Sequence, residues 1–196
     1  NTLKAAIAFK NSGLGIPILV AKEKVVQQRL KEIGYSENLN IEIVNSTFKN
    51  KREKYVNYIF KKLHREQGLL ERDCDRIIRN DRVVWGSCMV ACGDADAMVT
   101  GNTRRYGQSL DKVIKVIDPR PGEIMFGLNM VVNKGRTVFM ADTTVHEYPS
   151  SSQLAEIAIS AARVVRLFGF DPKIAFLSHS TFGQPITSRT KHIRDA

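Results

Sequence analysis

Residues 137–183 decide the fold of this chain: TVFMADTTVHEYPSSSQLAEIAISAARVVRLFGFDPKIAFLSHSTFG. They begin with a mostly apolar run, residues 137–141, and they close with a continuous apolar run, residues 174–177, each typical of a buried strand. Between the runs, apolar residues recur at three- and four-residue spacing after a serine cap, and Gly169 and Pro172 end this pattern, which predicts a helix. The order strand, helix, strand predicts a βαβ unit with parallel strands and a right-handed crossover.

Polar side chains follow both predicted strands. Because the carboxyl ends of parallel strands meet at one edge of a sheet, and open α/β sheets bind ligands there, this edge is the first candidate site. We call it the hydroxyl cluster, and its residues are Asp142, Thr143, Thr144, Ser178, His179, Ser180 and Thr181. The alternative is that these residues only cap helices and turns. His146 and His179 each stand without a histidine or cysteine neighbour, which favours a hydrogen-bonded structural role.

A second candidate site follows a further predicted strand, residues 97–100. We call it the arginine turn, and it contains Gly101, Asn102, Thr103, Arg104, Arg105, Tyr106 and Gly107. The two glycines allow close backbone approach, and the two guanidinium groups are forked donors suited to phosphate. The alternative is a solvated turn.

The rest of the chain alternates helical and strand patterns, which predicts an α/β protein. Helices are expected at residues 2–9, 24–33, 54–64, 73–79, 83–91 and 109–117, strands at 18–21 and 41–44, and a hairpin at 126–141. Two prolines and a glycine within residues 118–122 mark the best boundary. We therefore expect a first subdomain at residues 1–122 and a second subdomain at residues 123–196, with the hairpin and the βαβ unit.

The net charge of +10 and the isoelectric point of about 9.7 suit a polyanionic partner, either nucleic acid or a phosphate-rich cofactor. Many of the basic residues lie between positions 49 and 82, where acidic residues interrupt them. This interleaving favours solvated helix faces over a nucleic-acid-binding stripe. No apolar run is long enough for a membrane span, and neither a nucleic acid nor a membrane is expected as a partner.

Three cysteines, Cys74, Cys88 and Cys92, form an odd number without a secretory signal, which predicts reduced thiols and a cytoplasmic protein. Cys88 and Cys92 can share a helix face, but no histidine lies near them, so buried, inert thiols are favoured over a metal site. Phosphate-binding loops of the G-x-x-x-x-G-K-[ST] type, dinucleotide fingerprints and zinc-ligand spacings do not occur, and we expect no catalytic residue, metal or cofactor site in this chain.

Five segments carry a resemblance to a known family. They are GDADAMVTG at residues 93–101, FMAD at 139–142, QLAEIA at 153–158, FGFDPK at 168–173 and LSHST at 177–181. Together they resemble the phosphate acetyl/butyryl transferase family from about residue 3 to residue 196. Within that family the LSHS segment and the following Phe182 and Gly183 are similar to the C-terminal domain of bacterial NADP-dependent malic enzymes.

This resemblance implies a three-layer, mostly parallel sheet of the isocitrate/isopropylmalate dehydrogenase-like type, with two subdomains and the two candidate sites facing one cleft. It implies acetyl-CoA as an effector, contacted by Arg104 and Arg105 at phosphate groups and by Ser178, Ser180 and Thr181 at phosphate or thioester oxygens. NADP and a divalent metal ion would belong to an N-terminal malic enzyme domain of a parent homo-oligomer. The chain starts at Asn1, without methionine, and the resemblance implies that a return segment to the first subdomain is missing, so we expect a piece of a longer protein.

The chain also departs from the family. Active transferases resemble it after Gly101 but have an arginine-proline pair where this chain has Asp111 and Lys112. A carboxylate in place of a guanidinium group reverses the local field at a phosphate, so we expect a regulatory module without acetyl transfer. The alternative is an active phosphate acyltransferase that moves an acyl group between CoA and phosphate.

Overall fold

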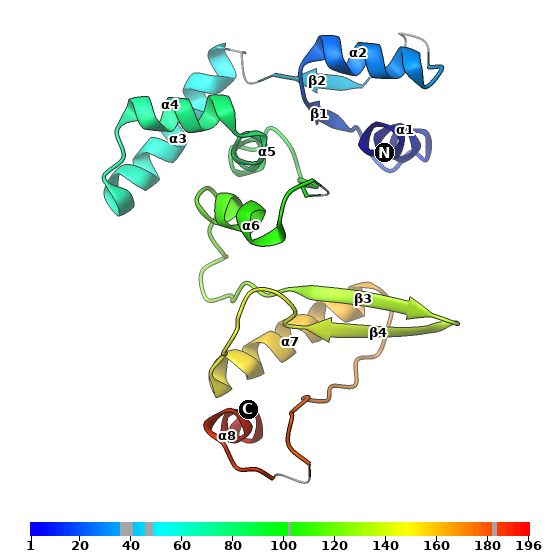
Figure 1. The fold of residues 1–196 in the computed structure, drawn as a ribbon, viewed down its shortest axis with the longest axis vertical. Coiled ribbons are helices and arrows are strands. Elements are labelled where there is room, and N and C mark those ends of the chain that lie inside the picture. The colour runs from blue at the N-terminus through cyan, green and yellow to red at the C-terminus, as the bar shows by residue number, and fades with distance from the viewer. Residues whose placement is uncertain (36–40, 46–48, 102, 182–183) are drawn as a thin grey trace. The chain divides into compact units, whose positions relative to one another are not determined.

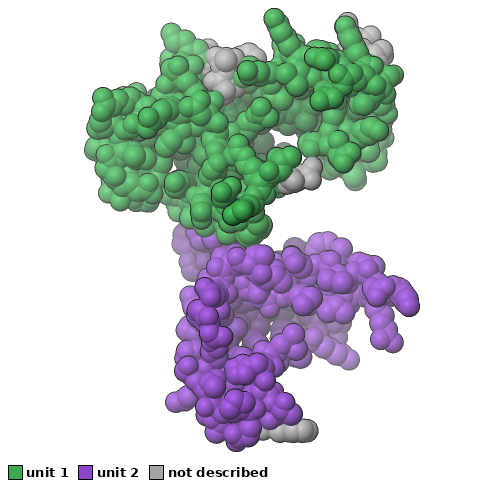
Figure 2. All heavy atoms as spheres, viewed as in Figure 1, with its two compact units in different colours: residues 1–118 green, residues 119–196 purple. Residues whose placement is uncertain are grey.

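The computed structural model describes residues 1–35, 41–45, 49–101, 103–181 and 184–196, with Asn50 described by its backbone alone. It divides into two compact units, Asn1–Asp118 (unit 1) and Pro119–Ala196 (unit 2), each described below by itself (Figure 2). Unit 1 contains these elements (Figure 1): α1 Thr2–Asn11, β1 Ile18–Val20, α2 Glu23–Glu32, β2 Glu42–Val44, α3 Lys49–Gln67, α4 Glu71–Asn80, α5 Arg82–Ala91 and α6 Tyr106–Ile114. Unit 2 contains β3 Leu128–Asn133, β4 Arg136–Ala141, α7 Ser151–Leu167 and α8 Ser188–Asp195.

A small parallel sheet opens unit 1. β1 pairs with β2 in parallel, with Ile18 opposite Glu42 and Val20 opposite Val44. The helix α2 connects these two strands, and its buried Val26 and Leu30 pack with Ile7 of α1. This part of the chain therefore forms the parallel strand-helix-strand arrangement, with helices and strands close to the predicted bounds.

The main core of unit 1 is helical. Tyr55, Ile59 and Leu63, which the sequence placed on one face of a helix, are at most 1% exposed. They pack in one cluster with residues of α4 and α5, among them the fully buried Trp85, whose ring meets the Tyr55 ring edge-on at a centroid distance of 5.0 Å. The prediction of a buried helix at 83–91 is confirmed, because seven of its residues from Val83 to Met89 are buried. This core fixes the N-terminus of α5, where part of the candidate site lies.

The GDAD segment after α5 has a structural role. The Asp94 carboxylate accepts a hydrogen bond from the Tyr55 hydroxyl at 2.8 Å. It also forms an ion pair with Lys54 Nζ at 3.0 Å. The same Lys54 Nζ donates to the carbonyl oxygen of Cys92 at 3.1 Å. These contacts attach the turn after α5 to α3.

The predicted strand at residues 97–100 is wrong. This segment has no strand partner among the described residues, and Val99 is fully exposed. The Met98 side chain lies directly against Gly86 of α5, where a Cβ would come within 2.6 Å of Met98 Sδ. A strand needs a hydrogen-bonded neighbouring strand, and this segment has none in the described part of the chain. It contacts the helix α5 through the Met98 side chain instead. The helix predicted at 109–117 begins three residues earlier, at Tyr106.

Unit 2 contains the predicted hairpin. β3 and β4 are antiparallel, with Met130 opposite Phe139 and Asn133 opposite Arg136, so Lys134 and Gly135 form the two-residue turn. The helix α7 packs on β4, and Phe139 contacts the rings of Phe168 and Phe170 at centroid distances of 5.8 and 5.5 Å. Figure 1 shows α7 lying along the hairpin, and α8 packs against α7.

The predicted second strand of the βαβ unit is also wrong. Residues 171–178 have no strand assignment, and the segment carries exposed apolar side chains, with Ile174 55% and Leu177 82% exposed. β4 pairs with β3. The parallel pair expected between residues 137–141 and 174–177 therefore does not form among the described residues. A buried parallel strand needs neighbours and cover on both faces. The described residues thus form two two-stranded sheets, one parallel and one antiparallel, rather than a mostly parallel sheet.

The predicted serine cap of α7 is confirmed at Ser150. Its Oγ accepts from the Gln153 backbone N–H at 3.3 Å, and Gln153 Oε1 accepts from the Ser150 N–H at 2.9 Å, which makes a capping box. We expect Ser150→Ala to lower the free energy of unfolding by about 1 kcal/mol, because a first-turn N–H loses its acceptor. Urea denaturation followed by circular dichroism measures this. Ser150→Asp restores an acceptor and is the matched control; equal losses in the two variants would contradict a capping role.

None of the helices in the described residues combines the length with the apolar character that a bilayer crossing requires.

Candidate functional site

Asp142 is the centre of the first part of the hydroxyl cluster, at the end of β4. Its side chain is only 3% exposed. Oδ1 accepts backbone N–H groups of Gly127, Thr144 and Val145 at 2.8 to 3.1 Å, and Oδ2 accepts the N–H of His146 at 2.8 Å. Burial alone would raise the pKa of this carboxyl, but the donors from Thr144, Gly127 and His146 outweigh it and lower the pKa to about 2. Asp142 therefore holds a loop together as a carboxylate.

His146 has a carboxylate partner, which the sequence reading missed. Its Nδ1 lies 2.8 Å from Asp142 Oδ2. The prediction of a structural, hydrogen-bonded histidine agrees with this contact, in which the partner is a carboxylate. The signal was present in the sequence, since an aspartate and a histidine four residues apart in a tight loop can share a hydrogen bond.

Gly127 is a second residue that the sequence reading missed. A Cβ at this position would overlap Thr144 Oγ1 and would lie 3.0 Å from Thr143 Oγ1. Thr143 Oγ1 is itself buried and has no hydrogen-bond partner among the described residues. The two threonines thus lie against a backbone position where only glycine fits without movement.

The second part of the hydroxyl cluster is a serine turn. Ser178 Oγ and Ser180 Oγ lie 2.9 Å apart, and the Ser180 N–H donates to Ser178 Oγ at 3.1 Å. Thr181 exchanges two backbone hydrogen bonds with Gln184, at 2.9 and 3.0 Å. Within the described part of unit 2, no hydrogen bond joins this turn to Asp142, Thr143 or Thr144. Because the strand at 174–177 does not form, the structure does not bring the two parts together at adjacent parallel strand ends.

In unit 1, the arginine turn leads into α6. Asn102 lies outside the described residues. The N–H of Thr103 donates to the Gly101 carbonyl oxygen at 2.9 Å, so the turn is tight, and Tyr106 is the first residue of α6 and is exposed. Arg105 is the N-cap residue, but its side chain makes no capping hydrogen bond.

Arg104 is bound by Asp81, a residue that the sequence reading did not single out. Arg104 Nη1 lies 3.2 Å from Asp81 Oδ1 and 3.1 Å from Oδ2. Asp81 also caps α5, because its Oδ1 accepts the Val83 N–H at 2.9 Å, and its Oδ2 pairs with Lys112 Nζ from α6. Burial would raise the pKa of Asp81, yet Lys112, the Val83 N–H and Arg104 together lower it. The signal in the sequence was an aspartate directly before a helix, which is a preferred cap.

The arginine turn belongs to unit 1 and the hydroxyl cluster belongs to unit 2. That the two face one cleft stays a prediction.

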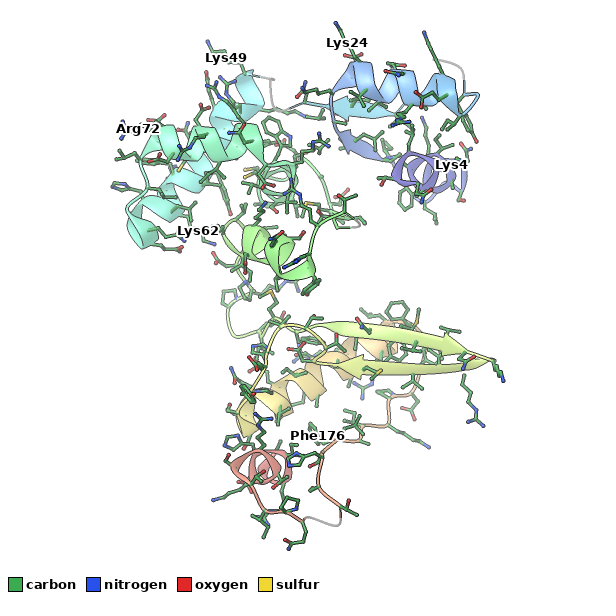
Figure 3. All side chains as sticks on the ribbon, in the orientation of Figure 1. Lys4, Lys24, Lys49, Lys62, Arg72 and Phe176 are labelled. Carbon is green, nitrogen blue, oxygen red and sulfur yellow. The ribbon has the colours of Figure 1, made fainter. Side chains whose placement is uncertain are left out.

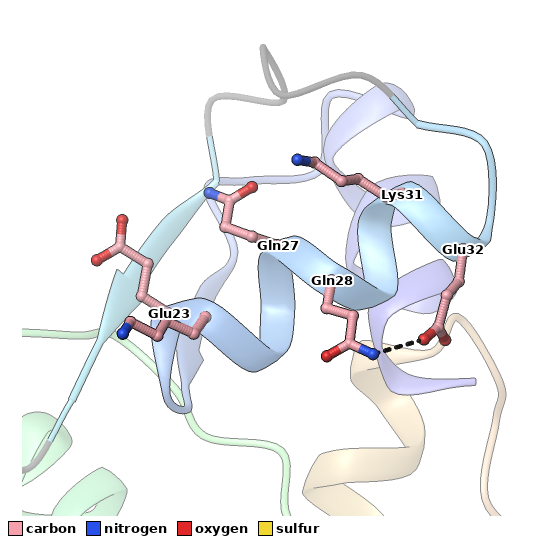
Figure 4. A pocket seen from close by; sticks show the side chains of 6 residues that line it. Glu23, Gln27, Gln28, Lys31 and Glu32 are labelled. Atoms are coloured by element: carbon pink, nitrogen blue, oxygen red, sulfur yellow. Dashed lines mark hydrogen bonds between the residues drawn. The ribbon is translucent and has the colours of Figure 1, made fainter.

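A shallow hollow lies along α2 (Figure 4). It contains none of the predicted site residues and is lined by Glu23, Lys24, Gln27, Gln28, Lys31 and Glu32.

The basic helices carry many ion pairs. Asp75 pairs with Arg52 Nε at 3.1 Å and with Arg79 Nη2 at 2.6 Å, and Asp118 pairs with Lys62 Nζ at 2.6 Å. Figure 3 shows Lys49 and Arg72 extending away from α3 and α4. This alternation of paired and outward charges supports solvated helix faces over a nucleic-acid stripe.

The thiols are in unreactive settings. Cys74 and Cys88 are fully buried, whereas Cys92 is only partly buried, so the predicted burial is confirmed for Cys88 and not for Cys92. Burial raises the pKa of Cys88 to about 12, and it also raises the pKa of Cys74 and of Cys92. Since the thiolate is the reactive form and the metal ligand, these shifts agree with the prediction of inert thiols.

Comparison with known proteins gives consistent matches over the whole chain. The family model for phosphate acetyl/butaryl transferase matches residues 1–196. An NADP-dependent malic enzyme of Rhizobium meliloti is 39% identical over 99% of this chain and 26% of its own length. A phosphate acetyltransferase of Nitratidesulfovibrio vulgaris is 32% identical over 91% of this chain and 25% of its own length. A phosphotransacetylase structure from Streptococcus pyogenes superposes with a TM-score of 0.83 at 26% identity, covering 98% of this chain and 58% of that chain. The chain thus spans about a quarter of the length of the malic enzyme it matches.

Proposed function

Because this chain belongs to the phosphate acetyl/butaryl transferase family, we propose that it binds acetyl-CoA or a related acyl-CoA and acts as a regulatory module. The parent protein would be an NADP-dependent malic enzyme that oxidises and decarboxylates malate to pyruvate in an N-terminal domain. The similarity to malic enzymes over nearly the whole chain, but over only a quarter of their length, supports this division. We extend the proposal to a complete fold of the isocitrate/isopropylmalate dehydrogenase-like type and to a homo-oligomer in the cytoplasm.

The observation that carries the proposal is the arginine turn. Arg104 and Arg105 are exposed at the start of α6, and the Arg105 side chain leaves the first N–H groups of this helix uncapped. Guanidinium groups and free N–H groups at a helix start are suited to the phosphates of a CoA ester. In unit 2, the paired hydroxyls of Ser178 and Ser180 are suited to donate to phosphate or thioester oxygens.

The cofactors of the parent would lie elsewhere. The described residues contain no group of three or more His, Cys, Asp or Glu side chains placed to hold a metal ion, so they do not fit a divalent metal site. We assign NADP and the metal ion to the N-terminal malic enzyme domain, because the similarity to NADP-dependent malic enzymes supports such a domain in the parent.

The chemistry of acyl transfer explains why we propose binding without catalysis. The sulfur of CoA would have to lose its proton and attack the carbonyl carbon of an acyl phosphate, while phosphate leaves with the electron pair of the broken C–O bond. A base would have to take the thiol proton, and cations would have to stabilise the leaving phosphate. Asp142 is a poor candidate for the base, since five hydrogen bonds hold it as a carboxylate with a pKa of about 2. Asp111 adds an exposed negative charge where the resemblance places an arginine.

We expect acetyl-CoA to bind the full-length protein and to change its rate of malate oxidation, and we expect no acetyl-CoA to form from acetyl phosphate and CoA. Isothermal titration calorimetry and a coupled malate assay measure the first two effects, and a thioester assay measures the third. An Arg104→Ala/Arg105→Ala double variant should bind acetyl-CoA at least about tenfold more weakly, because charge-assisted hydrogen bonds to phosphate are lost.

Equal affinity in the wild type and the double variant would remove the arginines from the site. Formation of acetyl-CoA would instead favour the alternative function, a phosphate acyltransferase, which the match to a phosphotransacetylase structure keeps open.

A further inference from the structure

Two cations from different elements of unit 1 meet at one carboxylate. Arg104 comes from the arginine turn and Lys112 comes from α6, and both contact Oδ2 of Asp81. The Asp81 side chain is 15% exposed, whereas the side chains of Arg104 and Lys112 are 37% and 31% exposed. The carboxylate is thus the covered member of the group, and the two cations face solvent more than it does.

The three side chains do not balance in charge. One carboxylate opposes two cations, so the group has a net charge of +1. Asp81 also accepts a hydrogen bond from the Val83 N–H, so one of its oxygen atoms is partly engaged in capping α5. Arg104 contacts Asp81 through Nη1 alone, so its Nε and Nη2 groups make no hydrogen bond to the described protein residues. A lysine ammonium has three N–H donors, and the single contact of Lys112 leaves two of them.

The surroundings also favour an anion. α6 begins directly after Arg104 and Arg105, and its first N–H groups receive no side-chain cap from Arg105. Asp111, beside Lys112 on the same helix, is exposed and has no ion pair among the described residues. Asp111 offsets the net charge of +1 on this group of three side chains, and the exposed Arg105 at the start of α6 restores an excess of one positive charge.

We infer that Arg104 and Lys112 form one anion-binding pair, which Asp81 holds in place, and that this pair binds a phosphate group of the acyl-CoA. The identity of this ligand rests on the proposed function, whereas the pair itself rests on the contacts above. Lys112 supplies positive charge next to Asp111, at the place where the family resemblance puts an arginine and this chain has a carboxylate. Asp81 is a positioning residue: it draws together two flexible side chains from separate elements and so reduces the entropy lost on binding.

The test is a double-variant cycle in the full-length protein with Arg104→Ala, Lys112→Ala and their combination. Calorimetry measures acetyl-CoA binding, and phosphorus NMR titration measures binding of inorganic phosphate. Each single variant should weaken acetyl-CoA binding by about tenfold to a hundredfold, the usual effect of losing a charged hydrogen bond. The combined effect should differ from the product of the single effects, because the two cations would contact the same phosphate group.

Lys115→Ala is the matched control, because it removes the same charge from the exposed end of the same helix and should leave both affinities unchanged. Lys112→Arg keeps the positive charge and should therefore retain binding. A role of Lys112 in folding alone would not predict this dependence of binding on charge. Thermal unfolding of every variant separates lost binding from lost structure, since each single variant leaves Asp81 one cation and its cap.

The two probes separate the two proposals. If acetyl-CoA binds and both alanine variants bind it as the wild type does, the cation pair is overturned and the proposed function stands. If acetyl-CoA does not bind but phosphate binds in a way that depends on Arg104 and Lys112, the pair stands and the proposed function fails. Binding of neither probe overturns both.

Discussion

Replacing Trp85 by alanine is expected to lower the free energy of unfolding of unit 1 by about 3–5 kcal/mol. Trp85 is fully buried, packs edge-on against Tyr55 and belongs to the cluster that joins α3, α4 and α5. Its loss would leave a cavity that the surrounding helices fill only in part. Urea unfolding followed by far-ultraviolet circular dichroism measures the change as a lower transition midpoint.

Trp85→Phe is the matched control for this prediction. The indole Nε1 is buried without a hydrogen-bond partner among the described residues, so phenylalanine removes no hydrogen bond from the protein. It also keeps an aromatic ring against Tyr55. We therefore expect a loss of only about 1 kcal/mol. If Trp85→Phe destabilised unit 1 as much as alanine does, the loss would not follow the size of the cavity, which would contradict this explanation.

Asp142→Ala is expected to have the largest effect in unit 2, a loss of about 3 kcal/mol or more in the free energy of unfolding. Four backbone N–H groups, from Gly127 and from residues 144–146, donate to this one carboxylate. Alanine would leave them without their acceptor in a partly buried loop. Amide hydrogen exchange of Gly127, Thr144 and His146 measures the change locally, and these amides should exchange at least about a hundredfold faster. Unchanged exchange rates would contradict the central role of Asp142.

The same carboxylate makes the stability of unit 2 depend on pH. Its pKa is about 2 in the folded protein, below the ordinary value of 3.8, so folding favours the charged form. The stabilisation is fully present above about pH 4 and is lost as the pH falls toward 2, and it amounts to about 2 kcal/mol. Asp142→Asn keeps the shape of the side chain but cannot titrate. The difference in unfolding free energy between wild type and Asp142→Asn should therefore shrink from pH 5 to about pH 2, and a constant difference would contradict the assignment.

The helices of this chain could be predicted from the sequence because a helix is a local structure. Each backbone N–H bonds to a carbonyl four residues back, so periodicity and end signals are readable within a short window. The Ser150 cap and the buried face formed by Tyr55, Ile59 and Leu63 are examples that the structure confirms. The family could also be predicted, because five short segments in the right order specify it, and the match over residues 1–196 confirms it.

The candidate site was only half predictable. The sequence indicated Arg104 and Asp142, because arginines after a predicted strand and an aspartate at a strand end are local patterns. It did not indicate that Asp81 would bind Arg104, a residue 23 positions later, or that Gly127 would leave room for Thr143 and Thr144. These partners lie far apart in sequence, so only the packing of α5 against α6 and the approach of Gly127 to the end of β4 bring them together.

The sequence by itself determined the helices, the Ser150 cap, the tight hairpin and the family. The tertiary structure alone decided which apolar runs pair as strands and which charges share a partner. The physical reason is that a strand at 97–100 or 174–177 needs hydrogen-bonding neighbours from elsewhere in the chain, and the described residues supply none. In the same way, Arg104 becomes half of a cation pair only because folding places Lys112 and the largely buried Asp81 carboxylate beside it.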